Sequence, residues 1–510
     1  MNAVKKRFNY LFTSTRGLIL VAFALIALVT AVWGTLSGPM VEWGVRDVTV
    51  RLLGMDLVQA EREGRIIMLY HTIAMAVIAA EVYMITDLVR MPRHQQVTIN
   101  ATITIGYLVS LIFGLGFGYF GHNFLFHGLF LLGQSLVFFA GILLAAGLWP
   151  WKDQYRLPPE SARARTRRGL DLERTAFFVM AVATLVSSTF GAVTGSYWGS
   201  GHETFLAEDL IRNPYKTMLQ KSIIGHLHIM LTLIAVAATL IVGRWLNFRG
   251  FLHKLAMPLM IAGTIVTTAG ALSVVWLEWA HTTIYFGSTF IMLAALMYVI
   301  FSWDRLIRTR LQEQEIQNPD VWQKLKALVH DPLKFGTGWQ MVFMNFTVSG
   351  VGIFMAVKLD EIFRVWPHRE ERIILTGHWH ILSGLIATIL LFYYADLAGL
   401  RGRIRRWFGW SILIGSDLAF GAVTVFSMKR LFVEKAAQQS LVNWTMLMTD
   451  LGLAAVLVVL AGLMIWRLYD LFRRDGRWHA EYQREKKRWT KQEIEEKQQQ
   501  LSELTAELEE

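Results

Sequence analysis

The sequence predicts an all-α membrane protein, a polytopic bundle of twelve transmembrane helices in three pseudo-repeats of four. Three observations favour this fold class. The chain of 510 residues is 54% hydrophobic with a mean hydropathy of +0.39, which is typical of a chain that has a bilayer for its solvent. It contains twelve apolar runs of about 20 residues, the length that crosses a membrane. Two of these runs also carry matching motifs, which indicates an internal repeat.

Each apolar run is expected to form one membrane-spanning helix. In chain order the runs lie at 17–38, 65–89, 99–120, 125–149, 174–198, 221–244, 253–277, 281–302, 339–358, 371–395, 405–428 and 441–468. Residues 1–470 are therefore expected to form a membrane domain. Residues 471–510 are charged and rich in glutamine, which predicts a cytosolic helical tail.

The charge distribution predicts the orientation. The loops after the even-numbered runs are rich in Arg and Lys, whereas most other loops are mixed or acidic. Basic loops stay on the cytoplasmic side of a membrane, so both termini are expected in the cytoplasm of a cell's inner membrane. The same loops account for the net charge of +11, so membrane lipid is the expected partner and nucleic acid is not.

Histidines near one end of three apolar runs are the most informative feature. Two runs carry a doublet, in Gly225-His226-Leu227-His228 and in Gly377-His378-Trp379-His380, and a third carries His71. With the expected orientation, all five histidines lie about two turns inside the outer face. Neutral imidazole is a common axial ligand of haem iron, so the pattern predicts haem. Because the chain has no cysteine, that haem must be held without thioether bonds or iron–sulfur ligation.

The two doublets lie in similar segments. The stretch 224–229 followed by Leu-Ile-Ala matches the stretch 376–381 followed by Leu-Ile-Ala, so helices 5–8 and 9–12 are expected to be copies, and helices 1–4 to follow the same plan. Residues two apart on a helix point about 200° apart. A doublet therefore serves two neighbouring sites rather than one metal ion. A zinc or copper site with three histidines from several helices is the competing geometry.

Twelve helices in three pseudo-repeats, cytoplasmic termini, a histidine on the second helix and His-x-His on the tenth together resemble subunit I of the haem-copper oxidase superfamily. The nitric-oxide-reductase and cbb-type branches are the nearest, and the resemblance covers about residues 15–470. It implies that His71 and His380 hold a low-spin haem and that His378 holds a second haem.

The chain departs from that family at its active-site metal. The family uses a histidine pair on helix 7, and the seventh run here, from Lys254 to Leu277, has no histidine. The sixth helix also lacks the family's Glu and Tyr near its histidines, so the usual copper site and proton channels are not expected.

The sixth helix offers its own doublet instead. If the three repeats are related by rotation, the relation of His380 to His71 predicts that His228 faces His378 and completes the coordination of its haem. His226 is then a spare ligand. His281, with Glu278 and His226, is a further candidate metal site.

The sequence therefore predicts an integral membrane b-type cytochrome with two haems. It would carry electrons between a donor at the outer face, such as a periplasmic cytochrome, an iron–sulfur subunit or quinol, and a respiratory partner within a larger complex. The alternative is an oxidoreductase, a terminal reductase of O2 or NO with a further metal or haem at a noncanonical site. A proton-relaying transporter is a third possibility, which the parallel repeats and unbroken runs disfavour.

Overall fold

The computed structural model describes residues 3–37, 41, 43–57, 62–121, 123–197, 218–277, 279–363, 365–366 and 368–509. Throughout these residues the regular structure is helical, and the only β-bridge joins Arg165 to Asp171. The all-α prediction is confirmed.

Twelve helical segments of the described residues are long and apolar enough to cross a membrane, which confirms a multi-pass membrane protein. They are α2 (Thr15–Ser37), α4 (Arg62–Leu88), α5 (Arg93–Tyr119), α6 (Phe124–Leu148), α7 (Leu172–Tyr197), α9 (Met218–Trp245), α10 (Phe251–Ser273), α11 (Ala280–Glu313), the continuous run of α13 (Pro332–Phe343), η4 (Met344–Gly350) and α14 (Val351–Val357), then α15 (His368–Leu397), α16 (Gly402–Ser427) and α18 (Gln438–Phe472).

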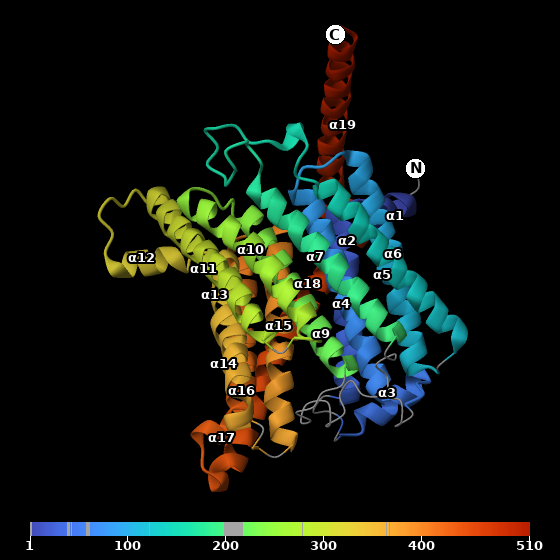
Figure 1. Cartoon of the computed structure of the whole chain (residues 1–510), viewed down its shortest axis with the longest axis vertical. Helices are drawn as coiled ribbons and strands as arrows, with labels where there is room; N and C mark the ends of the chain where they lie inside the picture. The colour runs from blue at the N-terminus through green and yellow to red at the C-terminus, as the bar shows by residue number, and fades with distance from the viewer. Residues whose placement is uncertain are drawn as a thin grey trace. The chain divides into compact units, whose positions relative to one another are not determined.

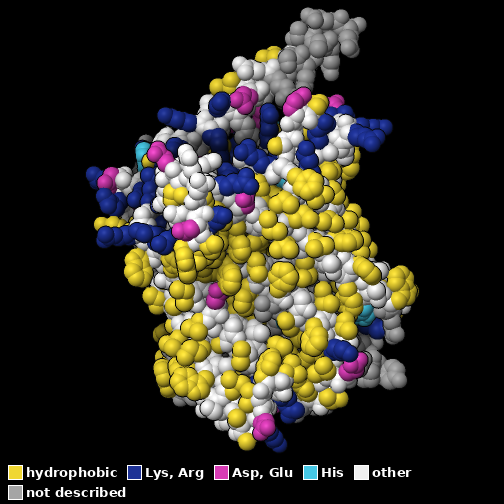
Figure 2. Space-filling model, turned by 90° about the vertical axis from the view of Figure 1, so that its left-hand side faces the viewer, with side chains coloured by type: hydrophobic (Ala, Val, Ile, Leu, Met, Phe, Trp, Pro, Cys, Tyr) yellow, Lys and Arg dark blue, Asp and Glu magenta, His cyan; other side chains and the backbone are white. Residues whose placement is uncertain are grey.

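Shorter helices lie between or beyond these spans. They are α1 (Ala3–Thr13), α3 (Val45–Leu53), η3 (Asp153–Tyr155), α12 (Val321–Leu328), η5 (Leu359–Phe363), α17 (Lys429–Phe432) and η6 (Lys435–Ala437), and the long α19 (Arg477–Glu509) follows the last span. Hydrophobic side chains cover the lengths of the spanning helices, while most Lys and Arg side chains gather beyond the helix ends (Figure 2). This distribution matches an apolar layer bounded by water on both sides.

Helix starts follow ordinary capping chemistry. The Asn123 side chain accepts a hydrogen bond from the Phe126 amide at 2.8 Å and caps α6. Asp331 caps α13, and Pro332 occupies the first turn, where its missing N–H costs nothing. Local sequence therefore determines where these spans begin.

The chain divides into two units, and Figure 1 labels the helices that belong to each. The first comprises Met1–Asp56, Met68–Trp149 and Leu460–Glu510, and the second comprises Leu57–Ile67 and Pro150–Val459. The first unit thus contains α1, α2, most of α4, α5 and α6 together with the end of α18 and α19. The second contains α7 and the helices from α9 to most of α18.

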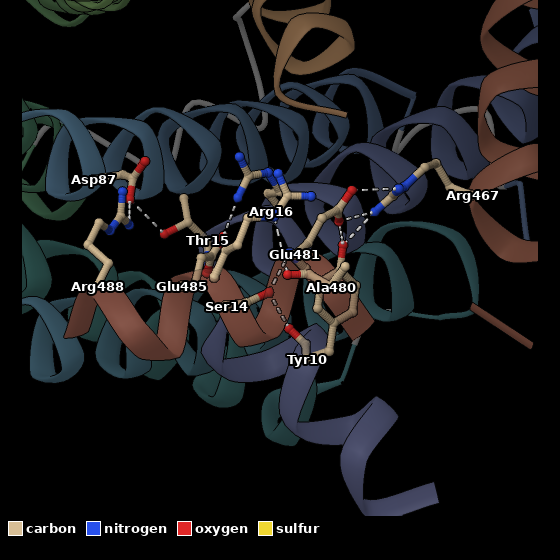
Figure 3. Close-up of polar contacts among 12 residues, drawn as sticks. Tyr10, Ser14, Thr15, Arg16, Asp87, Arg467, Ala480, Glu481, Glu485 and Arg488 are labelled. Atoms are coloured by element: carbon tan, nitrogen blue, oxygen red, sulfur yellow. Dashed lines mark hydrogen bonds and ion pairs between the residues drawn. The ribbon is translucent and has the colours of Figure 1, made fainter. Parts of the chain in front are cut away.

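The first unit joins the two ends of the chain (Figure 3). The buried Tyr10 hydroxyl of α1 donates to Glu481 Oε2 of α19 at 2.8 Å. Arg467, near the end of α18, donates to the same carboxylate at 2.8 Å and also to the Tyr10 hydroxyl. Trp478 and Tyr482 pack beside Tyr10 in one buried cluster. The tail expected beyond residue 470 therefore begins as a packed part of the first unit.

Three pairs of neighbouring helices touch through reciprocal glycines. The pairs are Gly106 with Gly133 between α5 and α6, Gly263 with Gly287 between α10 and α11, and Gly415 with Gly452 between α16 and α18. At each position an added Cβ would lie closer to the carbonyl oxygen of the partner glycine than ordinary van der Waals contact, at 3.1 Å or less. Close backbone approach at small residues is the usual means of helix packing in membranes.

Burial along α9 and α15 follows one pattern. Ile229, Leu233 and Ile234 are buried, as are Ile381, Leu385 and Ile386 at the matching positions 152 residues later. This agreement is what two copies of one helix in similar surroundings would give. It supports a relation between helices 5–8 and 9–12, while the full arrangement of three repeats stays a prediction.

Candidate functional site

In the second unit, two of the predicted histidines lie together. The rings of His228 on α9 and His378 on α15 have centroids 6.4 Å apart, with 39° between their planes. Both side chains are half-buried, and each lies about three turns from the start of its helix. Two imidazoles from different membrane-spanning helices thus lie beside each other.

Trp379 contacts both rings. Its indole centroid lies 5.4 Å from the His228 ring in an edge-on arrangement and 5.5 Å from the His378 ring. Such aromatic contacts limit the rotation of an imidazole about its side-chain bonds. The middle residue of the second doublet therefore packs against both histidines, a contact that the motif alone does not predict.

The ring separation fits a single metal ion held from both sides. A metal–nitrogen bond of about 2 Å and about 1.1 Å from the nitrogen to the ring centroid give about 6.2 Å between two trans imidazole centroids. The observed 6.4 Å agrees with this value. Two imidazole nitrogens are a donor set that haem iron takes, but the Trp379 indole lies beside both rings, so a porphyrin between them would require that side chain to turn away.

His226 faces a different helix from His228. Its Nδ1 lies 3.0 Å from the Ser187 carbonyl oxygen of α7, and an added Cβ on Gly191 of the same helix would lie 2.5 Å from the imidazole Cε1 atom. A carbonyl oxygen only accepts hydrogen bonds, so Nδ1 carries the hydrogen and Nε2 has the lone pair. The two imidazoles of this doublet are therefore separated between α7 and α15.

The remaining candidates lie on three different helices. His380 is exposed on α15 in the second unit, and His281 is exposed at the start of α11. His71 is half-buried on α4 in the first unit, so its pairing with His380 stays a prediction. Glu278, the expected companion of His281, lies outside the described residues.

A π-helical segment adjoins the histidine pair. The span from Pro332 changes from α-helix to π-helix at η4 and returns to α-helix at α14. An added Cβ on Gly352, in the first turn of α14, would lie 3.7 Å from the His378 Cδ2 atom. π-Helical segments inside longer helices occur often at functional sites. Hydropathy alone does not distinguish the two helix types, so the sequence did not predict the π-helical segment.

The seventh span contains a histidine, His253. The stretch from Lys254 to Leu277 omits His253, which both the expected run at 253–277 and α10 from Phe251 include, so the expected absence of a histidine from the seventh helix is wrong. The His253 Nδ1 accepts a hydrogen bond from the Ala164 amide at 2.8 Å, and its Nε2 lies 3.6 Å from Glu173 Oε2. The ring is therefore held between the loop before α7 and the first turn of α7. It also lies at the α10 end nearest the C-terminus of α9, about 25 Å along that helix from His228.

Across the described residues, no group of three or more His, Asp or Glu side chains is arranged to hold a metal ion. The candidate set of His226, His228 and His281 is thus not gathered into one site in this part of the chain. No protein-family model, curated protein or solved structure matches the sequence. The resemblance to haem-copper oxidases therefore depends on the short motifs alone.

Proposed function

We propose that this protein is an integral membrane b-type cytochrome in which His228 and His378 are the axial ligands of one haem. The single observation that carries the proposal is the 6.4 Å separation of these two rings, which come from two different membrane-spanning helices. Imidazoles are rare inside a membrane and costly without a role. Two imidazoles that lie beside each other in this setting are best explained by an iron ion bound between them.

The chain's own residues provide binding and orientation. His228 and His378 would supply the nitrogen donors, and the buried Ile229 and Ile381 keep adjoining helix faces apolar. A haem ligated on both sides exchanges single electrons without binding a substrate at its iron. Electron transfer is therefore the activity that this geometry supports best.

The resemblance extends the proposal to a second haem and to partners. His71 and His380 are proposed to hold a second b-type haem. The basic loops favour an inner-membrane location with cytoplasmic termini. Both haems would then lie near the outer face, where a periplasmic cytochrome, an iron–sulfur subunit or quinol exchanges electrons with them.

Purified protein from haem-replete cells provides the test. We expect low-spin haem that does not bind carbon monoxide in the reduced state. In the His228→Ala variant one haem should become high-spin and bind carbon monoxide stoichiometrically, because its iron loses one axial ligand. The matched control is His226→Ala, two residues away on the same helix, which should leave both haems low-spin because that ring faces α7.

Optical spectra, paramagnetic resonance spectra and haem-to-protein ratios would measure these outcomes. Absence of haem from the wild-type protein would reject the proposed function. Stoichiometric carbon monoxide binding by the wild type would favour the terminal reductase instead. If His226→Ala and not His228→Ala opened the site, the assignment of His228 would be wrong.

A further inference from the structure

The short helix α12 has an apolar face that points away from the protein. Its exposed apolar side chains are Val321, Trp322 and Leu325, with exposed fractions of 78%, 69% and 46%. Ala327, which lies about 160° from Leu325 around the helix, is buried. The helix therefore packs through one side and leaves a bulky apolar side uncovered.

Two lysines border the uncovered side. At 100° per residue, Lys324 and Lys326 each lie about 100° from Leu325, one on either side of it, and both are exposed. An apolar strip between two lysines is typical of helices that lie in the plane of a membrane surface. There the lysine stems reach along the apolar layer and place their ammonium groups in the headgroups.

The connections of α12 keep it close to the membrane. Only three residues separate its end at Leu328 from Pro332, where the span containing α13 begins. Three residues extend over at most about 11 Å, and each headgroup layer is about 5 to 8 Å thick. Asp331 lies in this connection and pairs with Arg405 in the first turn of α16 at 2.9 Å, which ties the end of α12 to the ends of two spans.

The other end of α12 is also fixed. A capping box formed by Asp320 and Gln323 stabilises its first turn. The helix lies across the end of α11 at the edge of the second unit (Figure 1). Its uncovered side is therefore presented next to the lipid that surrounds the spans.

We infer that α12 is an interfacial helix whose occupant is the bilayer itself. Val321, Trp322 and Leu325 enter the boundary between headgroups and acyl chains, and Lys324 and Lys326 lie among the headgroups. The assignment is independent of haem, since it depends only on the spans and on α12.

The natural absence of cysteine allows a direct test on the full-length protein in lipid bilayers. Nitroxide labels on single cysteines at Leu325→Cys and Val321→Cys report collisions with oxygen, which concentrates in the acyl layer, and with a water-soluble nickel chelate. Leu293→Cys, exposed in the middle of α11, is the bilayer reference, and Gln317→Cys, exposed in the loop before α12, is the water reference.

We expect labels at 325 and 321 to show a several-fold higher ratio of oxygen to nickel collisions than the label at 317, with values approaching that at 293. A label at Lys324→Cys should fall between the references. Nickel accessibility at 325 and 321 equal to that at 317 would overturn the inference, because the strip would then face water. Protection of both positions from oxygen and nickel alike would also overturn it, because another protein would then cover the strip.

Discussion

At the scale of single residues, His253 shows how a buried histidine joins a loop to a bundle. Its Nδ1 accepts from the Ala164 amide, so the hydrogen of the neutral ring resides on Nε2, on the side of Glu173. Arg163 of the same loop and Arg244 of α9 also pair with Glu173, at 2.6 and 3.2 Å. Charges of both signs are thus buried together with their partners, as low-dielectric surroundings require.

Replacing His253 by Phe should lower the free energy of unfolding by about 1–3 kcal/mol, the cost of leaving a buried donor without its acceptor. Ala164 loses its acceptor, and Glu173 loses one neighbouring donor. Thermal or denaturant unfolding in detergent would measure the change. The control, His94→Phe at an exposed position, should change stability by much less, and equal effects of the two substitutions would contradict the role of the loop contact.

The histidine positions were predictable from the sequence, whereas their surroundings were not. A spacing of two residues predicts that His226 and His228 face different neighbours, because helix geometry alone dictates the angle. That Ser187 and Gly191 receive one ring and Trp379 the other depends on how α7 and α15 pack. Such contacts join residues far apart in sequence and leave no local pattern.

At the scale of helices, the glycine contacts determine how closely neighbouring spans approach. Gly415 and Gly421 lie on the same helix, α16, in opposite situations. An added Cβ on Gly415 would lie 2.9 Å from the Gly452 carbonyl oxygen of α18, whereas one on Gly421 would meet nothing within 4 Å. The helix thus contains both a test position and its control.

Gly415→Ala should destabilise the protein by about 1–3 kcal/mol, because the methyl group overpacks a contact between two backbones. Gly421→Ala should be neutral or stabilise by up to about 1 kcal/mol, because alanine favours the helix more than glycine does. Unfolding in detergent would compare the two variants. Similar values for both would mean that the close approach of α16 and α18 contributes little.

The spans themselves were predictable, since about 20 consecutive apolar residues suffice to identify a membrane helix. Their ends differ from the predicted ones by several residues in places, as at Glu313, where α11 ends 11 residues beyond the expected position 302. The π-helical segment η4 was not predictable, because α- and π-helix differ in their hydrogen-bond register and not in a residue type that the sequence would reveal.

At the scale of the whole molecule, the first unit joins both ends of the chain through groups that respond to pH. Glu485 of α19 accepts hydrogen bonds at 3.0 Å from the Thr15 amide and from Arg16, close to the ion pair between Arg488 and Asp87 (Figure 3). Burial and the neighbouring Asp87 raise the pKa of Glu485 above its ordinary value, against the opposing effects of Arg16, Arg488 and the Thr15 amide.

A carboxyl with a raised folded-state pKa contributes stability that is full below its unfolded pKa and is lost as pH rises through the folded pKa. Amide hydrogen exchange of α19, corrected for its intrinsic rate, should therefore show decreasing protection as pH rises between about 4 and 7. Glu485→Gln should flatten this dependence, whereas Glu493→Gln, at an exposed position, should retain it. An unchanged dependence in Glu485→Gln would assign the effect to another group.

The bond between Tyr10 and Arg467, 457 residues apart, also imposes an order of assembly. At about 5–20 residues per second, a ribosome needs about 20–90 s after making the first residue to make the second. The first unit therefore stays incomplete during almost all of translation, while nearly all of the second unit, from Pro150 to Val459, emerges as one uninterrupted stretch. A nascent chain that stops before Leu460 would hold every residue of the second unit and an unfinished first unit, so the stretch from Leu460 completes a unit that residues 1–56 and 68–149 began.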